Sequence, residues 1–550
     1  MIDAYQALLV VLILGSAILA ARLLAPYVMR VYSRAPGRLD RLLNPIENAI
    51  YRVVGADPSH AMGWKEYFLA ALYVNLVQMA IAFVILTYQG VLPLNPQHFL
   101  GLRWDLAFNT VVSFATNTNL QHYAGEFQLS YLSQMTAIQF LQFTSAATGV
   151  CAAIAFSRAL TSGAKDMGNF YVDFVRSITR LLVPLCLVAS IILVWLGIPQ
   201  TLAGYAKVTT LEGIVSGASQ IIRVGPVASL VSIMQLGTNG GGYYGANSAN
   251  PFQNPNPATD IFEIFLMLLL PTTLCFVYGG ILGRKRETRP ILFAAYALFA
   301  IDLVIALIPN VALGAGIETR IGGFFSQFWT VVTTAVTTGS VNTSLSAMPP
   351  LTTISAFMGM LIQATPGGKG VGLMYMVMYV IITVFIVGLM SGRTPEYLGI
   401  KITSRDVKLV MVAFLVHPLI ILIPTILAFA TGAAAAVGAT VSASGFTQVF
   451  YEFTSAAANN GSDFLGTSAN TLFFNVSTAV VMFLGRYVPI GVLLALAGSM
   501  IGRKRSSEAG LKTDSLIFSA VLVASILILV VLTFFPFLVL GPILSYYQGA

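Results

Sequence analysis

The chain has 550 residues, of which 57% are hydrophobic and 9% are charged, and its mean hydropathy is +0.82. Soluble globular proteins carry about 25% charged residues, so this composition excludes a soluble enzyme, a disordered protein and a secreted disulfide-rich module. The net charge of +8 arises from Lys and Arg clusters between apolar runs, a distribution typical of membrane proteins rather than of nucleic-acid-binding proteins.

Ten apolar runs are long enough to cross a bilayer, whose hydrocarbon core of about 30 Å requires roughly 20 helical residues. They predict an all-α polytopic membrane protein with ten transmembrane helices. The first run lacks a basic amino-terminal region and is too long for a signal peptide, so we expect a retained helix. The predicted spans are residues 7–29, 67–88, 133–157, 177–198, 261–283, 289–308, 350–391, 407–430, 471–501 and 515–541.

The basic residues predict how these helices are oriented. Of the 29 Lys and Arg residues, 22 lie in alternate loops. Because positively charged loops remain in the cytoplasm, both termini are predicted to be extracellular, in a multi-pass protein of the cell membrane. The exceptions are Arg103, Lys207, Arg223 and Arg320 in the opposite loops, and Arg22, Lys369 and Arg486 within apolar runs.

Each predicted external loop contains an apolar stretch too short to span, followed by a segment rich in Thr, Asn, Ser and Gly. An offset of 220 residues aligns residues 110–115 with 330–335, and an offset of 121 residues aligns 325–335 with 446–456. These matches predict four pseudo-fourfold repeats of helix, pore helix, filter loop and helix, with an extra helix at each end. The predicted boundaries are 1–65 for the first extra helix and a cytoplasmic loop, 66–160, 170–284, 287–395 (with a broken second helix) and 405–502 for the pore repeats, and 513–550 for the last helix.

The polar loops are predicted to form a cation site. Irregular backbone at membrane depth is tolerated where it lines a water-filled cavity, and four such loops can replace the hydration shell of an ion with carbonyl oxygens. Three adjacent glycines, Gly240 to Gly242, are unlikely to continue a helix, which argues against simple helix packing. Asp463 is the one carboxylate in the core motifs, so a monovalent cation fits better than a divalent one.

A resemblance to a known family rests on residues 116–123 (TNTNLQHY), 237–255 (GTNGGGYYGANSANPFQNP), 391–401 (SGRTPEYLGIK) and 459–462 (NNGS). These segments resemble the potassium-binding A subunit of the Kdp-type potassium-transporting ATPase, within the superfamily of potassium transporters, and the likeness extends along essentially the whole chain. The resemblance implies an ion site formed by Asn117, Thr118, Asn119, Thr238, Asn239, Gly240, Thr337, Thr338, Gly339, Asn459, Asn460 and Gly461, with Gln121 at the filter edge.

The resemblance also implies the cargo and the partners. The transported ion would be extracellular K⁺, selected in the filter and passed to a P-type ATPase catalytic subunit of the Kdp B type. A Kdp C-type subunit, a small single-span subunit and membrane lipid would be further partners, with no nucleic acid.

The chain itself is predicted to have no catalytic residues. It contains neither a G-x-x-x-x-G-K-[ST] nor a D-K-T-G motif, and its longest predicted cytoplasmic loop has about 35 residues, too few for a nucleotide-binding domain. We therefore expect a non-catalytic subunit that binds no nucleotide and draws its energy from a partner or an ion gradient.

Two cations inside apolar runs suggest a gate or an ion path, because a charge at mid-membrane is functional or paired by default. Lys369 lies in a break of the seventh span at Pro366–Gly372 and is predicted to oppose free flow to the cytoplasm; the alternative is that it snorkels to a surface. Arg486 matches a family arginine on the lower side of the cavity, with a structural pair as the alternative. His122, which has no second histidine nearby, is predicted to line the vestibule.

Two other functions are compatible with the sequence. One is a stand-alone potassium channel or cation symporter like the Trk relatives, which would transport without ATP or a P-type partner. The other is a membrane enzyme or structural subunit whose polar loops serve only for packing; its activity would be indifferent to conservative changes such as Gly240→Ser.

Overall fold

The computed structural model describes residues 4–33, 35–37, 39–211, 218–308, 317–368, 370–505 and 511–548. Within these residues, ten helical segments are long and apolar enough to cross a membrane, which confirms the predicted all-α polytopic fold. They are α1 (Ala4–Ser33), α3 with a 3₁₀ turn (Trp64–Val91), α6–α7 (Tyr131–Ala159), α8–α9 (Phe170–Trp195), α12 (Pro257–Ile281), α13 with its leading turn η5 (Lys285–Leu307), α16 (Val371–Met390), α17 (Ser404–Ala430), α20 (Leu472–Met500) and α21–α22 (Leu516–Tyr547).

Four shorter helices lie between these spans, each in front of one of the polar loops. They are α4 (Trp104–Ala115), α11 (Val227–Leu236), α14 (Gly323–Ala335) and α19 (Ala443–Ala457). The predicted seventh span is not one helix. It consists of α15 (Pro350–Ile362) and α16, because Pro366 and the glycines around it interrupt the regular backbone.

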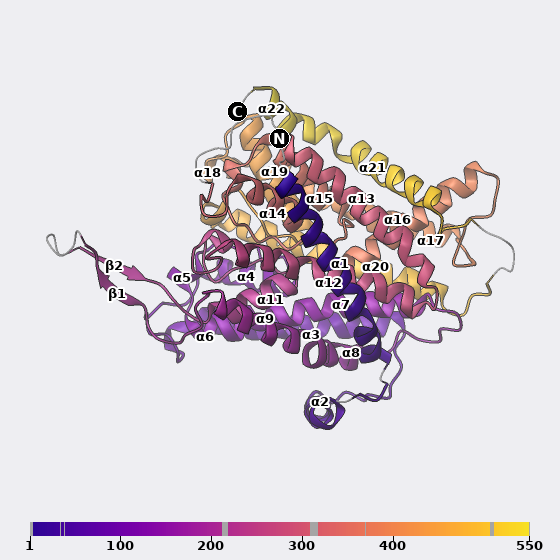
Figure 1. Cartoon of the computed structure of the whole chain (residues 1–550), viewed down its shortest axis with the longest axis horizontal. Helices are drawn as coiled ribbons and strands as arrows, with labels where there is room; N and C mark the ends of the chain where they lie inside the picture. The colour runs from indigo at the N-terminus through magenta and orange to yellow at the C-terminus, as the bar shows by residue number, and fades with distance from the viewer. Residues whose placement is uncertain are drawn as a thin grey trace.

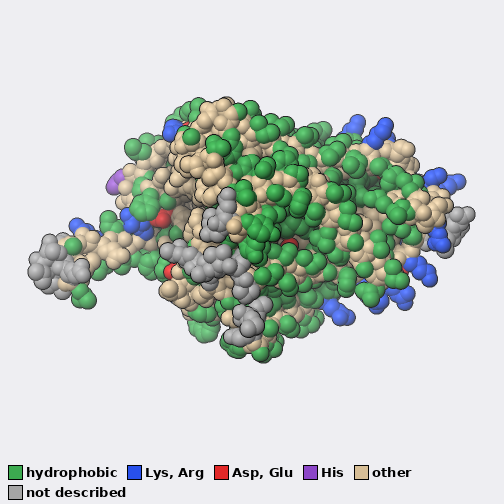
Figure 2. Space-filling model, turned by 90° about the horizontal axis from the view of Figure 1, so that it is seen from above, with side chains coloured by type: hydrophobic (Ala, Val, Ile, Leu, Met, Phe, Trp, Pro, Cys, Tyr) green, Lys and Arg blue, Asp and Glu red, His purple; other side chains and the backbone are tan. Residues whose placement is uncertain are grey.

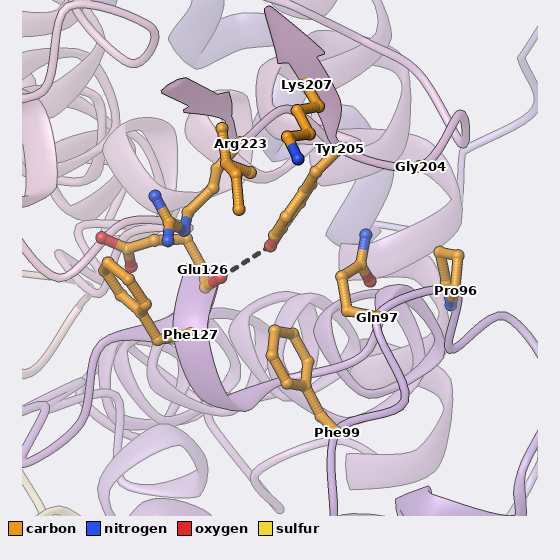
Figure 3. A pocket seen from close by; sticks show the side chains of 10 residues that line it. Pro96, Gln97, Phe99, Glu126, Phe127, Gly204, Tyr205, Lys207 and Arg223 are labelled. Atoms are coloured by element: carbon orange, nitrogen blue, oxygen red, sulfur yellow. Dashed lines mark hydrogen bonds between the residues drawn. The ribbon is translucent and has the colours of Figure 1, made fainter. Parts of the chain in front are cut away.

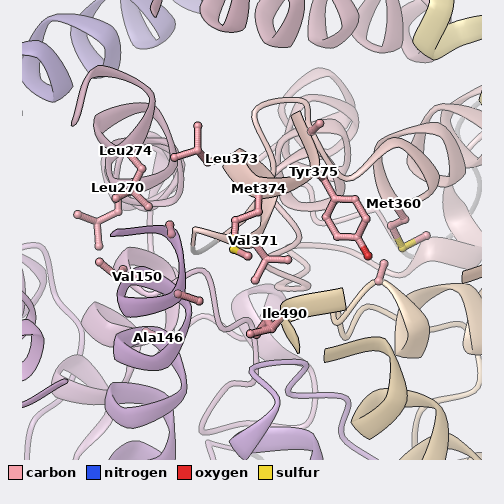
Figure 4. Close-up of a cluster of buried hydrophobic side chains, with 14 of the residues drawn as sticks. Ala146, Val150, Leu270, Leu274, Met360, Val371, Leu373, Met374, Tyr375 and Ile490 are labelled. Atoms are coloured by element: carbon pink, nitrogen blue, oxygen red, sulfur yellow. The ribbon is translucent and has the colours of Figure 1, made fainter. Parts of the chain in front are cut away.

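The centre of the bundle and its periphery differ in burial. In the most apolar window of the α6–α7 segment 89% of the residues are buried, against 22% for α1 and 28% for α21–α22. Apolar side chains from α7, α12, α16 and α20 fill the interior (Figure 4). The two terminal helices α1 and α21 pack on the outside, along α12 and α13 respectively (Figure 1). In Figure 2, hydrophobic side chains cover much of the surface, and most Lys and Arg gather at the end opposite β1 and β2.

Helix α2 (Asp40–Val54) lies beside the spans and is seen nearly end-on in Figure 1. Arg180 holds its polar face, with Nε 2.6 Å from the Glu47 carboxylate and Nη2 2.6 Å from Asn44 Oδ1. On the other face Leu42 and Val53 are exposed. Such an amphipathic helix fits a membrane interface, with its apolar face toward lipid.

A two-stranded antiparallel hairpin, β1 (Ala206–Thr209) and β2 (Ser219–Ile222), projects from the body (Figure 1). At its base lies a pocket of about 410 Å³, lined among others by Tyr205 and Arg223 (Figure 3). The Tyr205 hydroxyl donates to the Glu126 carbonyl over 2.7 Å, and the Arg223 guanidinium lies 4.0 Å from the Phe127 ring centroid. The remaining regular elements are α5 (Gly125–Gln128), β3 (Glu396–Tyr397), β4 (Ile400–Lys401), α18 (Ala433–Ala436) and short 3₁₀ or π turns.

Replacing Asp173 with Asn is expected to destabilise the fold by about 3 kcal/mol, because removing one partner leaves a buried charge uncompensated. The Asp173 carboxylate pairs with both Arg158 amino groups, at 2.6 and 3.0 Å, and is 2% exposed. Thermal unfolding in detergent measures the change. The matched control is Glu66→Gln at the His60 pair, where both side chains are 51% exposed and the change should stay below about 1 kcal/mol. Equal shifts in the two variants would contradict the expectation.

Candidate cation site

The four short helices end in the same way. Each is followed, two residues after its last residue, by a polar triplet: 117–119, 238–240, 337–339 or 459–461. In every triplet the middle N–H donates to the carbonyl five residues earlier. These bonds are Thr118 to Ser113 at 2.9 Å, Asn239 to Met234 at 2.8 Å, Thr338 to Thr333 at 2.8 Å and Asn460 to Ser455 at 2.9 Å.

This bond sets the direction of a backbone oxygen. In a trans peptide the N–H of one residue is antiparallel to the carbonyl of the residue before it. Since the middle N–H points back to its helix, the carbonyl of the first triplet residue points away from that helix. The first and third residues of every triplet have positive φ, from 45° at Thr337 to 105° at Gly461. Four segments far apart in the sequence therefore share one unusual backbone conformation.

The triplets also converge on one another. A methyl group on Gly240 would overlap the Thr338 carbonyl oxygen, one on Gly339 the Asn460 oxygen, and one on Gly461 the Thr118 oxygen. The first and second triplets meet where Asn119 Nδ2 lies 3.4 Å from Asn239 Oδ1. The loops thus form a closed ring in chain order. At the third position of the second, third and fourth triplets, both the close approach and the positive φ require glycine, whereas the first triplet has Asn119 there.

Side chains of the middle residues hold the ring from behind. Asn239 Nδ2 donates to the Ile233 carbonyl over 3.1 Å, and Asn460 Nδ2 to the Thr333 carbonyl over 3.0 Å. Thr118 Oγ1 accepts from Asn459 Nδ2 over 2.9 Å, which ties the first loop to the fourth. These side chains are committed to the protein, so the inward-facing oxygens belong mainly to the backbone.

Gln121, two residues after the first triplet, bridges the first two loops. Its Nε2 donates to the Gly242 carbonyl over 3.1 Å, and its Oε1 accepts from the Gly242 N–H over 2.9 Å. Asn247, which the sequence did not single out, donates to the Gly240 carbonyl over 2.6 Å. That oxygen is therefore turned toward protein. The carbonyl of Thr238, the first residue of the same triplet, also accepts a protein donor, from Asn117 Nδ2 over 2.8 Å.

A cavity of about 280 Å³ opens on the outer side of the ring. Its lining includes Asn119, Gly339 and Gly461, the third residues of three triplets, together with Glu126 and Asp463. Burial raises the pKa of Glu126, whose carboxylate accepts from the Gly245 N–H over 2.8 Å. Burial and repulsion from the Glu452 carboxylate raise the pKa of Asp463 to about 8.

His122 does not line this vestibule, contrary to the prediction, because its side chain is fully buried behind the first loop. Its Nε2 lies 3.0 Å from Glu452 Oε1, and its Nδ1 lies 2.7 Å from Asn475 Oδ1. Although burial by itself lowers the pKa of His122, the Glu452 carboxylate raises it above its usual value. No local sequence pattern indicates this contact, since the two partners are 330 and 353 residues away.

The break between α15 and α16 passes the inner end of the third triplet. The Gly367 N–H donates to the Ala335 carbonyl over 3.1 Å, and a methyl group on Gly368 would overlap Thr337 Oγ1. Gln363, in a left-handed conformation, ends α15, and its amide contacts the His417 ring. Lys369 lies outside the described residues.

Arg486 is fully buried in α20, and its Nη2 donates to the Ser145 carbonyl over 2.9 Å. This agrees with the structural pair considered from the sequence, here with a backbone oxygen of α7. A methyl group on the neighbouring Gly485 would overlap the Ala457 carbonyl at the end of α19, which puts this part of α20 next to the fourth pore helix.

Comparison with known proteins decides the family. The sequence profile of the family described as "Potassium-transporting ATPase A subunit" matches residues 10–547. The chain belongs to this family. The family resemblance inferred from the loop motifs is thereby confirmed.

Relatives match along nearly their full length. Two are proteins of Caldanaerobacter subterraneus, 45% identical over 544 residues (96% of each chain), and of Alicyclobacillus acidocaldarius, 47% identical over 537 residues (94% of this chain and 95% of the relative). A third, from Geobacillus kaustophilus, is 43% identical over 527 residues (93% of each). Each is named a potassium-transporting ATPase potassium-binding subunit.

Proposed function

We propose that this chain is the potassium-binding, channel-like subunit of an ATP-driven potassium uptake complex. The ring of four triplets carries the proposal, because four loops with the same backbone conformation contact one another, and the carbonyl of the first residue in each points away from its own short helix. Family membership and the names of the relatives support it. The ion site we propose consists of Asn117, Thr118, Asn119, Thr238, Asn239, Gly240, Thr337, Thr338, Gly339, Asn459, Asn460 and Gly461.

Selection follows from the chemistry of the ring. Neutral carbonyl oxygens replace the water shell of a monovalent cation, and their number and field determine which cation is favoured. The carboxyl ends of α4, α11, α14 and α19 lie next to the triplets, so the negative ends of their dipoles add attraction for a cation. K⁺ enters through the outer cavity, past Gln121 at the edge of the ring.

We also propose where K⁺ leaves the ring, from the positions of two basic residues. Gly368, in the break between α15 and α16, approaches Thr337 of the third triplet, and Arg486 follows Gly485, which approaches the end of α19. Lys369 is next to Gly368 in the sequence. Positive charges there oppose leakage of K⁺ to the cytoplasm. In this proposal both termini are extracellular, the complex lies in the plasma membrane, and the repeat boundaries are those predicted above.

The energy comes from a partner in this proposal. A P-type ATPase subunit of the Kdp B type hydrolyses ATP, and Kdp C-type and small single-span subunits complete the complex. The chain itself binds no nucleotide and supplies no catalytic residue.

The test is the ATPase activity of the co-purified complex, titrated with K⁺, Rb⁺ and Na⁺. We expect stimulation by K⁺ at concentrations on the order of 100-fold lower than by Na⁺, a selectivity of about 2.7 kcal/mol. Equal stimulation by the three ions would contradict a selective ring. Transport of K⁺ by the chain alone, without ATP or a partner, would favour the stand-alone channel or symporter instead.

A further inference from the structure

A cavity of about 450 Å³ opens between α1, α12 and α13, away from the ion ring. Arg22 of α1 and Lys285 and Arg289 at the start of the α13 segment bring three cations to its walls. None of the described residues that line it is acidic. The other lining residues are Ala25, Pro26, Met29, Phe276, Gly280, Thr288 and Leu292.

The floor of the cavity is preformed. Helix α1 packs along α12, and a methyl group on Gly280 would overlap the Met29 sulfur, so the two helices touch at this level. The volume lies within the range of about 300–1,000 Å³ that is usual for small-molecule sites. The site therefore needs no rearrangement of the helices to admit a headgroup-sized ligand.

Among the described residues, no carboxylate forms an ion pair with these three cations. None of the ion pairs in the described parts of the chain involves Arg22, Lys285 or Arg289. Arg22 lies well inside α1, on a helix whose Leu19 and Leu23 are 59% and 71% exposed and therefore face lipid. An arginine in such a position costs several kcal/mol unless it is paired or reaches polar groups.

We propose that this cavity binds the phosphate headgroup of an anionic phospholipid. Arginine can bind phosphate oxygens in a bidentate manner, and lysine adds a compact charge. Basic pockets between transmembrane helices are suited to lipid phosphates, and the lipid-facing surface of α1 provides a path for the acyl chains. A soluble phosphate shares the headgroup chemistry but cannot use that apolar path. A single-span protein is disfavoured, since it would have to bring an acidic group to the same depth.

Native mass spectrometry of the full-length protein, purified in detergent with its accompanying subunits, tests the proposal. Phosphatidylglycerol should be retained at least ~10-fold better than phosphatidylcholine. The triple variant R22Q/K285Q/R289Q should lose this preference. R22K, which keeps the charge, should retain most of it, so that a folding defect is distinguished from a lost site.

The matched control is K401Q/R405Q/K408Q, which removes three exposed cations around the start of α17. It should leave the preference unchanged. Equal losses in the two triple variants would overturn the proposal in favour of general surface attraction. If equimolar inorganic phosphate displaced the lipid, the lipid proposal would be overturned, and the cavity would be a site for a soluble phosphate. No lipid binding, with loss of a co-purified subunit in the triple variant, would show that a protein partner occupies the cavity.

Discussion

Replacing Gly339 with Ala is expected to weaken the apparent affinity for K⁺ by on the order of 100-fold. Gly339 has φ = 87°, and a methyl group there would overlap the Asn460 carbonyl oxygen of the adjacent loop. Either the backbone strain, about 1–3 kcal/mol, or the displaced oxygen distorts the ring. A loss of about 3 kcal/mol in ion binding corresponds to roughly 100-fold in affinity. The measurement is K⁺-stimulated ATPase activity of the complex, together with the K⁺/Na⁺ ratio.

The control for this variant is Gly432→Ala. Gly432 has φ = 76°, but a methyl group there would meet nothing within 4 Å. This variant therefore carries the backbone strain without the steric overlap, and its K⁺ affinity should change by less than about threefold. Unchanged affinity and selectivity in Gly339→Ala would exclude the ring as the selective element.

The apparent affinity for external K⁺ should fall about fivefold as the external pH falls from 9 to 6.5. Asp463 lines the outer cavity with a pKa raised to about 8 by burial and by the Glu452 carboxylate, so it is ionised above pH 8 and neutral below. Protonation of His122, whose pKa Glu452 also raises, acts in the same direction by adding positive charge. One unit charge near the entrance contributes about 1 kcal/mol, which is about fivefold.

Other charged residues lie near Asp463, Glu452 and His122, and the variants below leave them unchanged. Asn475 connects His122 to Asp105, which pairs with Arg103.

Asp463→Asn should remove most of the pH dependence and fix the affinity near the acidic value of the wild type. The control Glu318→Gln changes an external carboxylate paired with Arg320 and should keep the full pH profile. A pH profile that is unchanged in Asp463→Asn would refute the assignment.

The transmembrane spans could be predicted from the sequence because hydropathy is a local property. The described part of the chain contains ten membrane-length helical segments, and α12 begins at Pro257 where the prediction began at 261. The break near Pro366 was equally predictable, since proline and glycine interrupt a helix wherever they occur. The amphipathic helix α2 and the β1–β2 hairpin were not predicted, because both are short and lie outside the apolar runs.

The positions of the four polar loops could be predicted from repeated motifs, but their contacts depend on the packing of distant segments. The ring closes through pairs such as Gly461 and Thr118, which are hundreds of residues apart. Asn247 and Glu452 contact residues of the site, although no role could be assigned to either of them from the sequence. His122 was placed in the vestibule because the sequence does not show the carboxylate that packs against it.

The sequence by itself determined the membrane class, the spans, the predicted orientation and the identity of the loop residues, because composition and periodicity act over neighbouring residues. Tertiary structure alone decided which loops contact one another, which side chains brace them and which carboxylates line the adjoining cavity. Those properties arise because four short helices, each only marginally stable in isolation, pack together and bring the loops within contact distance.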